Sequence, residues 1–76
     1  MNYRNYIESD YRIMLGKPVI KGTRLSVEMI LRKLGEGAST TDLLSMYPHL
    51  TSEALQAAML YAAEMIANEE SLESAS

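Results

Sequence analysis

The sequence contains no cysteine, and this absence excludes a disulfide framework and a thiolate metal site. A long hydrophobic run is also missing: the longest, residues 57–63, is far shorter than the roughly 18 residues of a membrane span. The amino terminus has no apolar signal core, so we expect a cytoplasmic protein without a membrane partner. A chain of 76 residues has room for one small core. We therefore predict one domain over residues 1–68 and an acidic, disordered tail over residues 69–76.

Lysine and arginine are absent after Lys33, and this divides the chain by charge. The first 33 residues hold seven basic and three acidic side chains, a net charge of +4, whereas the rest holds seven acids and no base, a net charge of −7. A basic half can face phosphates, while an acidic half repels them. Two other interpretations stay open: the halves neutralise each other within a dimer, or the charges are only solvated faces.

Short β-strands are predicted near the amino terminus. In residues 19–25 a glycine, Gly22, lies between two β-prone stretches, which favours short strands and a hairpin-like turn. Pro18 fits the first position of a strand or an edge, where its missing N–H costs least. Two or three strands alone need helices or a second chain to cover them.

The signals after residue 25 predict helices. Ser26 is a good N-cap for a first helix, which is expected to end at Gly35 or Gly37. Residues 39–42 have the spacing of a capping box, with aspartate in place of glutamate, for a short second helix. Pro48 forbids its continuation.

A longer third helix is predicted to begin after Thr51, which is its cap, and to lose its pattern and fray from Ala67. Its predicted apolar face consists of Leu55, Ala58, Met59, Ala62, Met65 and Ile66. The apolar surface of this helix extends beyond one face, which suggests packing against a partner subunit; for any single residue, filling the domain's own core is the simpler interpretation. The sequence thus predicts a mainly α fold, in which short N-terminal β-strands precede a three-helix, helix-turn-helix core.

Side chains suited to catalysis are scarce. The only histidine, His49, lies in a Pro-His-Leu turn, and there is no cysteine nucleophile. The carboxylates near the C-terminus form no preorganised cation cage, and residues 35–37 are too short for a phosphate-binding loop. We predict no enzyme, no cofactor and no metal.

The helix-turn-helix pattern raises the question of nucleic-acid binding. The second helix of such a motif ordinarily reads base edges. Here it offers only Gln56 as a base reader near its start, and Glu53 repels phosphates. Any DNA contacts are therefore expected from the basic half: Lys17, Lys21, Arg24, Arg32 and Lys33. A simpler alternative for Arg24 is an ion pair with Glu28, four residues later, or with another acid.

Three segments of the chain resemble one known family. They are GKPVIKGTRL at residues 16–25, LGEGAS at residues 34–39 and YPHLT at residues 47–51. Their ordered occurrence is similar to the family catalogued as domain of unknown function 433, and the resemblance covers about residues 6–66. Proteins of that family resemble VapB-type antitoxins and are typically encoded beside a PIN-like ribonuclease toxin. The resemblance implies a homeodomain-like helical core, a homodimer, and binding to the toxin and to the operon's own promoter DNA.

Antitoxins of this wider class often place a basic side chain in the toxin's acidic active site, and this chain has no base after Lys33. We expect the acidic half to face the nuclease instead, because a ribonuclease presents a positive surface to RNA. The predicted partner-binding residues are Glu53, Glu64, Glu69, Glu70 and Glu73. A stand-alone DNA-binding regulator and a dimerisation module without a nucleic-acid role are the alternatives.

Overall fold

A computed structural model describes residues 1–69 of the chain. Its elements are η1 (Tyr3–Asn5), β1 (Ile7–Glu8), η2 (Met14–Gly16), β2 (Val19–Ile20), α1 (Val27–Gly35), α2 (Thr40–Met46) and α3 (Ser52–Glu69). The predicted fold class, short N-terminal strands followed by three helices, is confirmed.

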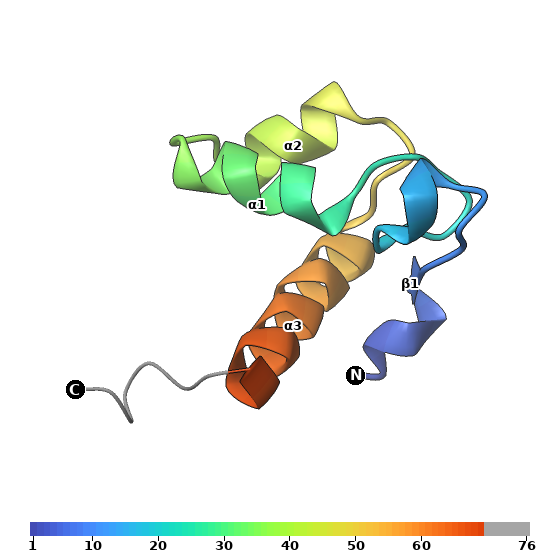
Figure 1. Cartoon of the computed structure of the whole chain (residues 1–76). Helices are drawn as coiled ribbons and strands as arrows, with labels where there is room; N and C mark the ends of the chain where they lie inside the picture. The colour runs from blue at the N-terminus through green and yellow to red at the C-terminus, as the bar shows by residue number, and fades with distance from the viewer. Residues whose placement is uncertain (70–76) are drawn as a thin grey trace.

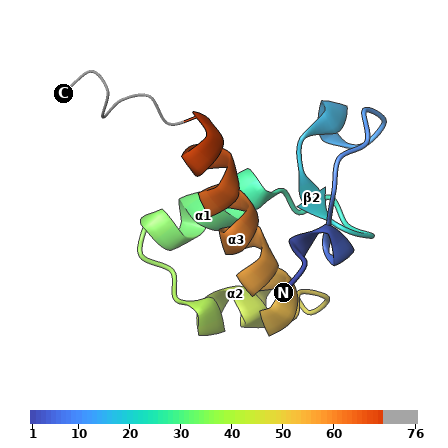
Figure 2. The ribbon, with the colours of Figure 1, turned by 90° about the horizontal axis from the view of Figure 1, so that it is seen from below.

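Helix α3 lies in the middle of the fold (Figure 1). Helices α1 and α2 contact it on one side, and η1 and β1 contact it on the other. The view from below shows the same order, with the N-terminal segment and the helix pair separated by α3 (Figure 2). The rings of Tyr3 and Tyr61 meet edge to face, with centroids 5.4 Å apart, and tie η1 to α3. A helix enclosed in this way buries more than one face.

The two strands form an antiparallel ribbon, in which Ile7 pairs with Ile20 and Glu8 with Val19. The predicted turn is present at Gly22, whose φ of +78° suits glycine, and the Thr23 N–H donates to the Ile20 carbonyl at 3.0 Å. The stretch after the turn forms only an isolated bridge to β2, so the strand partner comes from earlier in the chain.

The predicted helix starts are confirmed by their hydrogen bonds. Ser26 Oγ accepts from the Met29 N–H at 3.0 Å, and the Thr51 hydroxyl accepts from the Ala54 N–H at 3.1 Å. At the start of α2, Ser39 and Asp42 exchange side-chain bonds to each other's backbone N–H groups at 3.0 and 2.9 Å. This reciprocal pair is the predicted capping box.

Helix α1 ends in a Schellman motif at Gly37, whose φ is +109°. The Ala38 N–H donates to the Lys33 carbonyl at 3.0 Å, and the Gly37 N–H donates to the Leu34 carbonyl at 3.1 Å. Of the two glycines predicted to end the helix, Gly37 therefore adopts the left-handed conformation, while Gly35 is the last helical residue.

The core lies where α1, α2, β1 and β2 meet the first half of α3. Its buried apolar residues are Ile7, Val19, Ile20, Val27, Ile30, Leu43, Leu50, Ala54, Leu55, Ala57 and Ala58. The predicted apolar face of α3 was wrong at Met59 and Ile66, which are exposed, and it omitted Ala54 and Ala57, which are buried. The small alanine side chains let neighbouring elements approach α3 from two sides.

The predicted fraying was also wrong for residues 67–69, because α3 is helical through Glu69. Alanine and glutamate are good helix formers, and the backbone hydrogen bonds of a helix do not require a buried face at every turn. The predicted acidic tail over residues 69–76 thus begins with a helical residue, and its other residues lie outside the described part of the chain.

Candidate functional site

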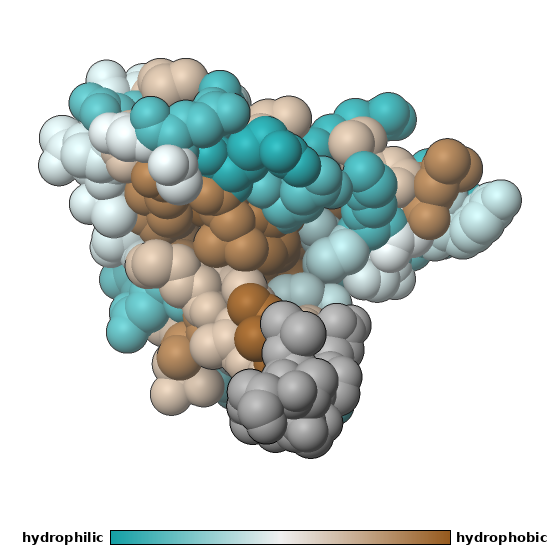
Figure 3. Space-filling model, turned by 60° about the vertical axis from the view of Figure 1, so that its left-hand side comes forward, coloured by the Kyte–Doolittle hydropathy of each residue, from teal (hydrophilic) through white to brown (hydrophobic). Residues whose placement is uncertain are grey.

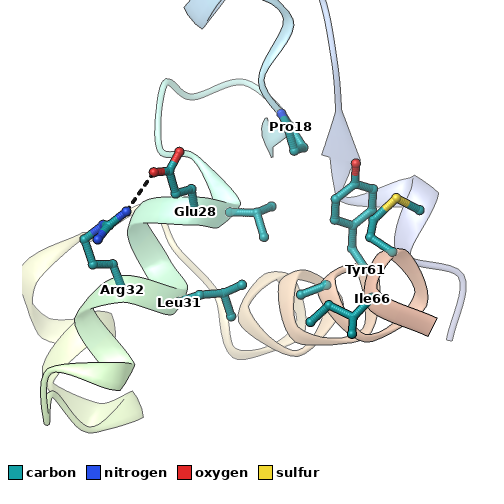
Figure 4. A pocket seen from close by; sticks show the side chains of 9 residues that line it. Pro18, Glu28, Leu31, Arg32, Tyr61 and Ile66 are labelled. Carbon is teal, nitrogen blue, oxygen red and sulfur yellow. Dashed lines mark hydrogen bonds and ion pairs between the residues drawn. The ribbon is translucent and has the colours of Figure 1, made fainter. Parts of the chain in front are cut away.

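A groove of about 890 Å³ lies between α1 and the second half of α3. Its lining residues are Pro18, Val27, Glu28, Leu31, Arg32, Tyr61, Ala62, Met65 and Ile66. In the close-up, Leu31 comes from α1, Tyr61 and Ile66 come from α3, and Pro18 closes one end (Figure 4). A space-filling view shows apolar side chains gathered in a hollow between hydrophilic surfaces (Figure 3).

The groove follows from the unequal lengths of the two helices. Helix α1 has 9 residues and α3 has 18, which at 1.5 Å per residue gives lengths of about 14 and 27 Å. The second half of α3 therefore continues past the part that α1 covers. Ile66, in this half, is 66% exposed, although isoleucine is among the residues most often buried.

One edge of the groove carries an ion-pair network centred on Glu28. Its two carboxylate oxygens accept from Lys17 Nζ and from Arg32 Nη2, each at 3.0 Å. These hydrogen bonds, the one from Lys17 foremost, lower the pKa of Glu28 below its usual range. Lys17 and Arg32 were predicted to contact DNA, and the structure instead brings them together on one carboxylate.

The alternative interpretation of Arg24, an ion pair with Glu28, was wrong, because Glu28 pairs with the two other cations. Arg24 and Lys21 lie exposed in the loop between β2 and α1, and Lys33 lies half-buried in the last turn of α1. Within residues 1–68, whose side chains the structure describes, no acid forms an ion pair with any of these three cations. The five predicted DNA-binding residues thus divide into a paired group and an unpaired group.

Three of the five predicted partner-binding acids lie on α3. Glu53 lies in its first turn and Glu64 in its second half, and both are exposed. They are eleven positions apart, or about 16 Å along the axis, close to three full turns, so they lie near one face. Glu69 is the last residue of α3, and Glu70 and Glu73 lie outside the described residues.

The first turns of α3 correspond to the reading helix of a helix-turn-helix protein. Their exposed side chains are Ser52, Glu53 and Gln56. Arginine and lysine make the commonest specific base contacts, and this surface has neither. The arrangement is therefore chemically poor in base-reading groups.

Metal and membrane sites are not found in residues 1–69. In that part of the chain no three His, Asp or Glu side chains gather closely enough to hold an ion. None of its helices combines the length and the apolar character needed to cross a bilayer. Apart from Arg32, which was predicted to contact DNA, the residues that line the groove were not predicted as a site, because the spacing of the apolar ones in the sequence is that of ordinary core residues.

The fold and the groove define a class of small helical protein with an N-terminal β-ribbon and an uncovered apolar surface. The model of the family described as "Protein of unknown function (DUF433)" matches residues 7–62, so the chain belongs to the DUF433 family. The crystal structure of a DUF433 member protein from Anabaena variabilis ATCC 29413 is similar, with a TM-score of 0.76 and 33% sequence identity over 87% of this chain and 68% of that chain. No curated protein gives a significant match.

Proposed function

We propose that this DUF433 protein is an antitoxin-like protein that binds a PIN-like ribonuclease, with the α1–α3 groove as its docking surface. The observation that carries the proposal is the groove itself, which is lined mainly by apolar side chains and leaves Ile66 two-thirds exposed. Exposed apolar hollows with a polar edge are typical of protein-docking surfaces. In the complex, an apolar segment of the nuclease fills the groove.

The charge of α3 also favours a nuclease as the partner. Glu53 and Glu64 are exposed near one face of the helix. Glu64 lies in the hollow that Tyr3 and Leu60 line, outside the α1–α3 groove, so in the proposed complex the nuclease extends around α3. A ribonuclease holds a polyanion and therefore presents positive potential around its active site. The carboxylates of α3 take the place of RNA phosphates on that surface, and neutralisation results from blocked access to the substrate.

The groove is tested by co-expression with a PIN-like ribonuclease from the same host. Ile66→Glu places a charge in the groove and is expected to weaken binding at least about tenfold and to abolish protection from the toxin. Met46→Glu is the matched control, because Met46 is also an exposed apolar residue but lies on α2, outside the groove. Equal protection by the two variants, both folded by circular dichroism, contradicts the proposal.

The acidic surface is tested separately by charge reversal. Glu64→Lys together with Glu53→Lys is expected to slow association with the nuclease, and more so at low salt, because rim charges act mainly on the association rate. Glu36→Lys, an exposed acid in the α1–α2 connection, serves as the control. An unchanged association rate for the double variant rules out electrostatic cover while leaving the groove proposal intact.

Promoter DNA is a second candidate ligand. It is also the ligand expected if the protein is a stand-alone DNA-binding regulator. It is favoured by the exposed Lys21 and Arg24, which form no ion pair within residues 1–68. Replacing both by glutamate is expected to weaken binding to every duplex alike, and each lost phosphate contact flattens the salt slope by about 0.9. If Gln56→Ala alone removes sequence preference, α3 is the reading helix after all.

We also propose that a second copy of the chain packs against the exposed part of α3 that lies outside the groove and beside η1. This proposal is the dimerisation alternative. Met59 and Leu60 are 40% and 42% exposed, and the neighbouring Ala63 is small enough for close approach of another helix. The opposite net charges of the two halves of the chain favour such pairing. Light scattering at micromolar concentration tests this: a dimer mass is expected for the native chain and a monomer mass for Leu60→Glu.

A further inference from the structure

A second hollow, of about 340 Å³, lies where two connections meet: the loop between β2 and α1, and the turn between α2 and α3. Its lining residues are Ile20, Thr23, Arg24, Leu25, Met29, Tyr47, Pro48, His49 and Leu50. None of them lines the α1–α3 groove, so the two hollows are separate surfaces.

The polar groups around this hollow are mostly hydrogen-bond donors. Arg24 is exposed and forms no ion pair within residues 1–68. The Tyr47 hydroxyl has the Met29 sulfur, at 3.8 Å, as its acceptor, and a thioether is a weak acceptor. The imidazole of His49 adds a further N–H. No carboxylate lines the hollow, so an anionic group is the complementary partner.

The remaining wall is apolar and held in shape by the loop. The Thr23 hydroxyl donates to the Ile20 carbonyl at 2.7 Å and accepts from the Leu25 N–H at 3.0 Å, so it is already occupied. Leu25, Met29 and Leu50 provide the apolar surface. The site therefore offers an apolar floor and at least two donors with no strong acceptor of their own, a combination that fits a ligand with an apolar group beside an anionic head.

A neighbouring hollow indicates that the ligand is an extended chain. It has a volume of about 420 Å³ and is lined by Ile13, Gly22, Thr23 and Arg24, so Arg24 belongs to the walls of both hollows. In an extended peptide, side chains two residues apart point to the same side and lie about 7 Å apart. A peptide can thus place neighbouring side chains in adjacent hollows, which a single small carboxylate cannot do.

We propose that this loop–turn pocket binds an extended acidic peptide segment of a partner protein. An apolar side chain of the peptide lies on Leu25, Met29 and Leu50, and the carboxylate of the residue two positions away accepts from Arg24 and Tyr47. The proposal does not depend on the ribonuclease or on the α1–α3 groove. Duplex DNA is the competing ligand, and it is disfavoured because phosphates gain nothing from an apolar floor.

The test is a nuclear magnetic resonance titration of the full chain with N-acetyl-leucyl-alanyl-glutamate amide, called the leucyl-glutamate probe below, in which the two recognised side chains are two residues apart. Amide shifts are expected at Arg24, Tyr47 and His49. Two matched probes separate the two halves of the ligand: the leucyl-glutamine analogue removes the charge, and the alanyl-glutamate analogue removes the apolar anchor. Each is expected to bind about tenfold more weakly, because each loses one of the two interactions.

Variants of the protein test the role of Arg24. Arg24→Gln is expected to reduce affinity for the leucyl-glutamate probe about tenfold, whereas Arg4→Gln leaves it unchanged, since Arg4 is exposed and lines neither hollow. The amide spectrum of each variant shows whether it is folded. Shifts that lie elsewhere, or an affinity that Arg24→Gln does not alter, overturn the proposal.

Two further ligands in the titration identify the source of the anionic group. Free 4-methylpentanoate carries the same apolar group and charge without a peptide backbone, and equal binding of this acid overturns the assignment to a peptide. A 16-base-pair duplex is the third ligand. If the duplex shifts Arg24 while the leucyl-glutamate probe does not, the pocket is part of a DNA surface and the peptide proposal is wrong.

Discussion

The two halves of α3 are chemically alike but lie in different surroundings. Residues 52–60 and 61–69 each combine alanines, a methionine and larger apolar residues. In the first half Leu55 is 2% exposed, because it lies in the hydrophobic core, whereas in the second half Ile66 is 66% exposed. Composition therefore does not determine which half of α3 is buried in the core. The extent to which neighbouring elements cover each half determines it.

We therefore expect the two halves of α3 to have different roles, one in stability and the other in binding. The buried half contributes apolar area to the core, which in so small a domain is the main source of stability. The uncovered half contributes little to the core and forms one wall of the α1–α3 groove. A substitution in one half should therefore change folding, and the same kind of substitution in the other half should change binding.

The largest expected effect comes from shortening a side chain in the buried half. Leu55→Ala is predicted to lower the free energy of unfolding by about 2–5 kcal/mol, because it removes buried methyl groups and leaves a cavity. Ile66→Ala, in the uncovered half, is predicted to change it by less than about 0.5 kcal/mol. Urea denaturation followed by circular dichroism measures both. Similar losses for the two variants mean that the halves are equally buried in solution.

The helix boundaries could be predicted because their signals are local. Ser26, Ser39 and Thr51 each accept a hydrogen bond from a backbone N–H three residues later, so the spacing in the sequence is sufficient. The extent of α3 and its buried face could not be predicted in the same way. Ala57 is buried by contacts from elements far away in the sequence, and periodicity alone does not reveal such contacts.

The candidate sites were less predictable than the helices. Glu28 pairs with Lys17, eleven positions earlier, rather than with Arg24, four positions earlier, and only the path of the chain through the ribbon explains this choice. The loop–turn pocket joins residues 22–25 with residues 47–50. Both segments were noted for their resemblance to the DUF433 family, but nothing in their spacing predicts that they meet.

The second prediction enlarges an alanine in each half. Ala57 is fully buried, so Ala57→Leu is predicted to destabilise the protein by about 1–3 kcal/mol through overpacking. Ala63 is exposed, so Ala63→Leu should lie within about 0.5 kcal/mol of the native chain. Leucine is a good helix former, and helix propensity does not account for a difference between the two. Thermal unfolding at low protein concentration compares them, and equal destabilisation would contradict the two-sided enclosure of α3.

The third prediction concerns Tyr61, the first residue of the second half. Its edge-to-face contact with Tyr3 is predicted to contribute a coupling energy of about 0.5–1.5 kcal/mol. A double-mutant cycle with Tyr3→Leu and Tyr61→Leu, measured by urea unfolding, isolates this contact from the area that each ring buries. A coupling energy near zero would place the N-terminal segment away from α3 in solution.

The smallest effect is expected at the edge of the groove, where Glu28 faces the uncovered half of α3. Lys17, and then Arg32, lower the pKa of Glu28 in the folded protein. A lowered folded-state pKa means that the charged carboxylate stabilises the fold at pH values above its unfolded pKa, and that this stabilisation is lost as the pH falls through the folded pKa. The native chain should thus be slightly more stable than Glu28→Gln at neutral pH, and the difference should vanish in acid. All three side chains are at least half exposed, so the effect is small and shrinks further at high salt.

Carboxyl titration by nuclear magnetic resonance identifies the cause: Lys17→Gln should raise the pKa of Glu28 more than Arg32→Gln does, and the reverse order would show that Arg32 is the main partner.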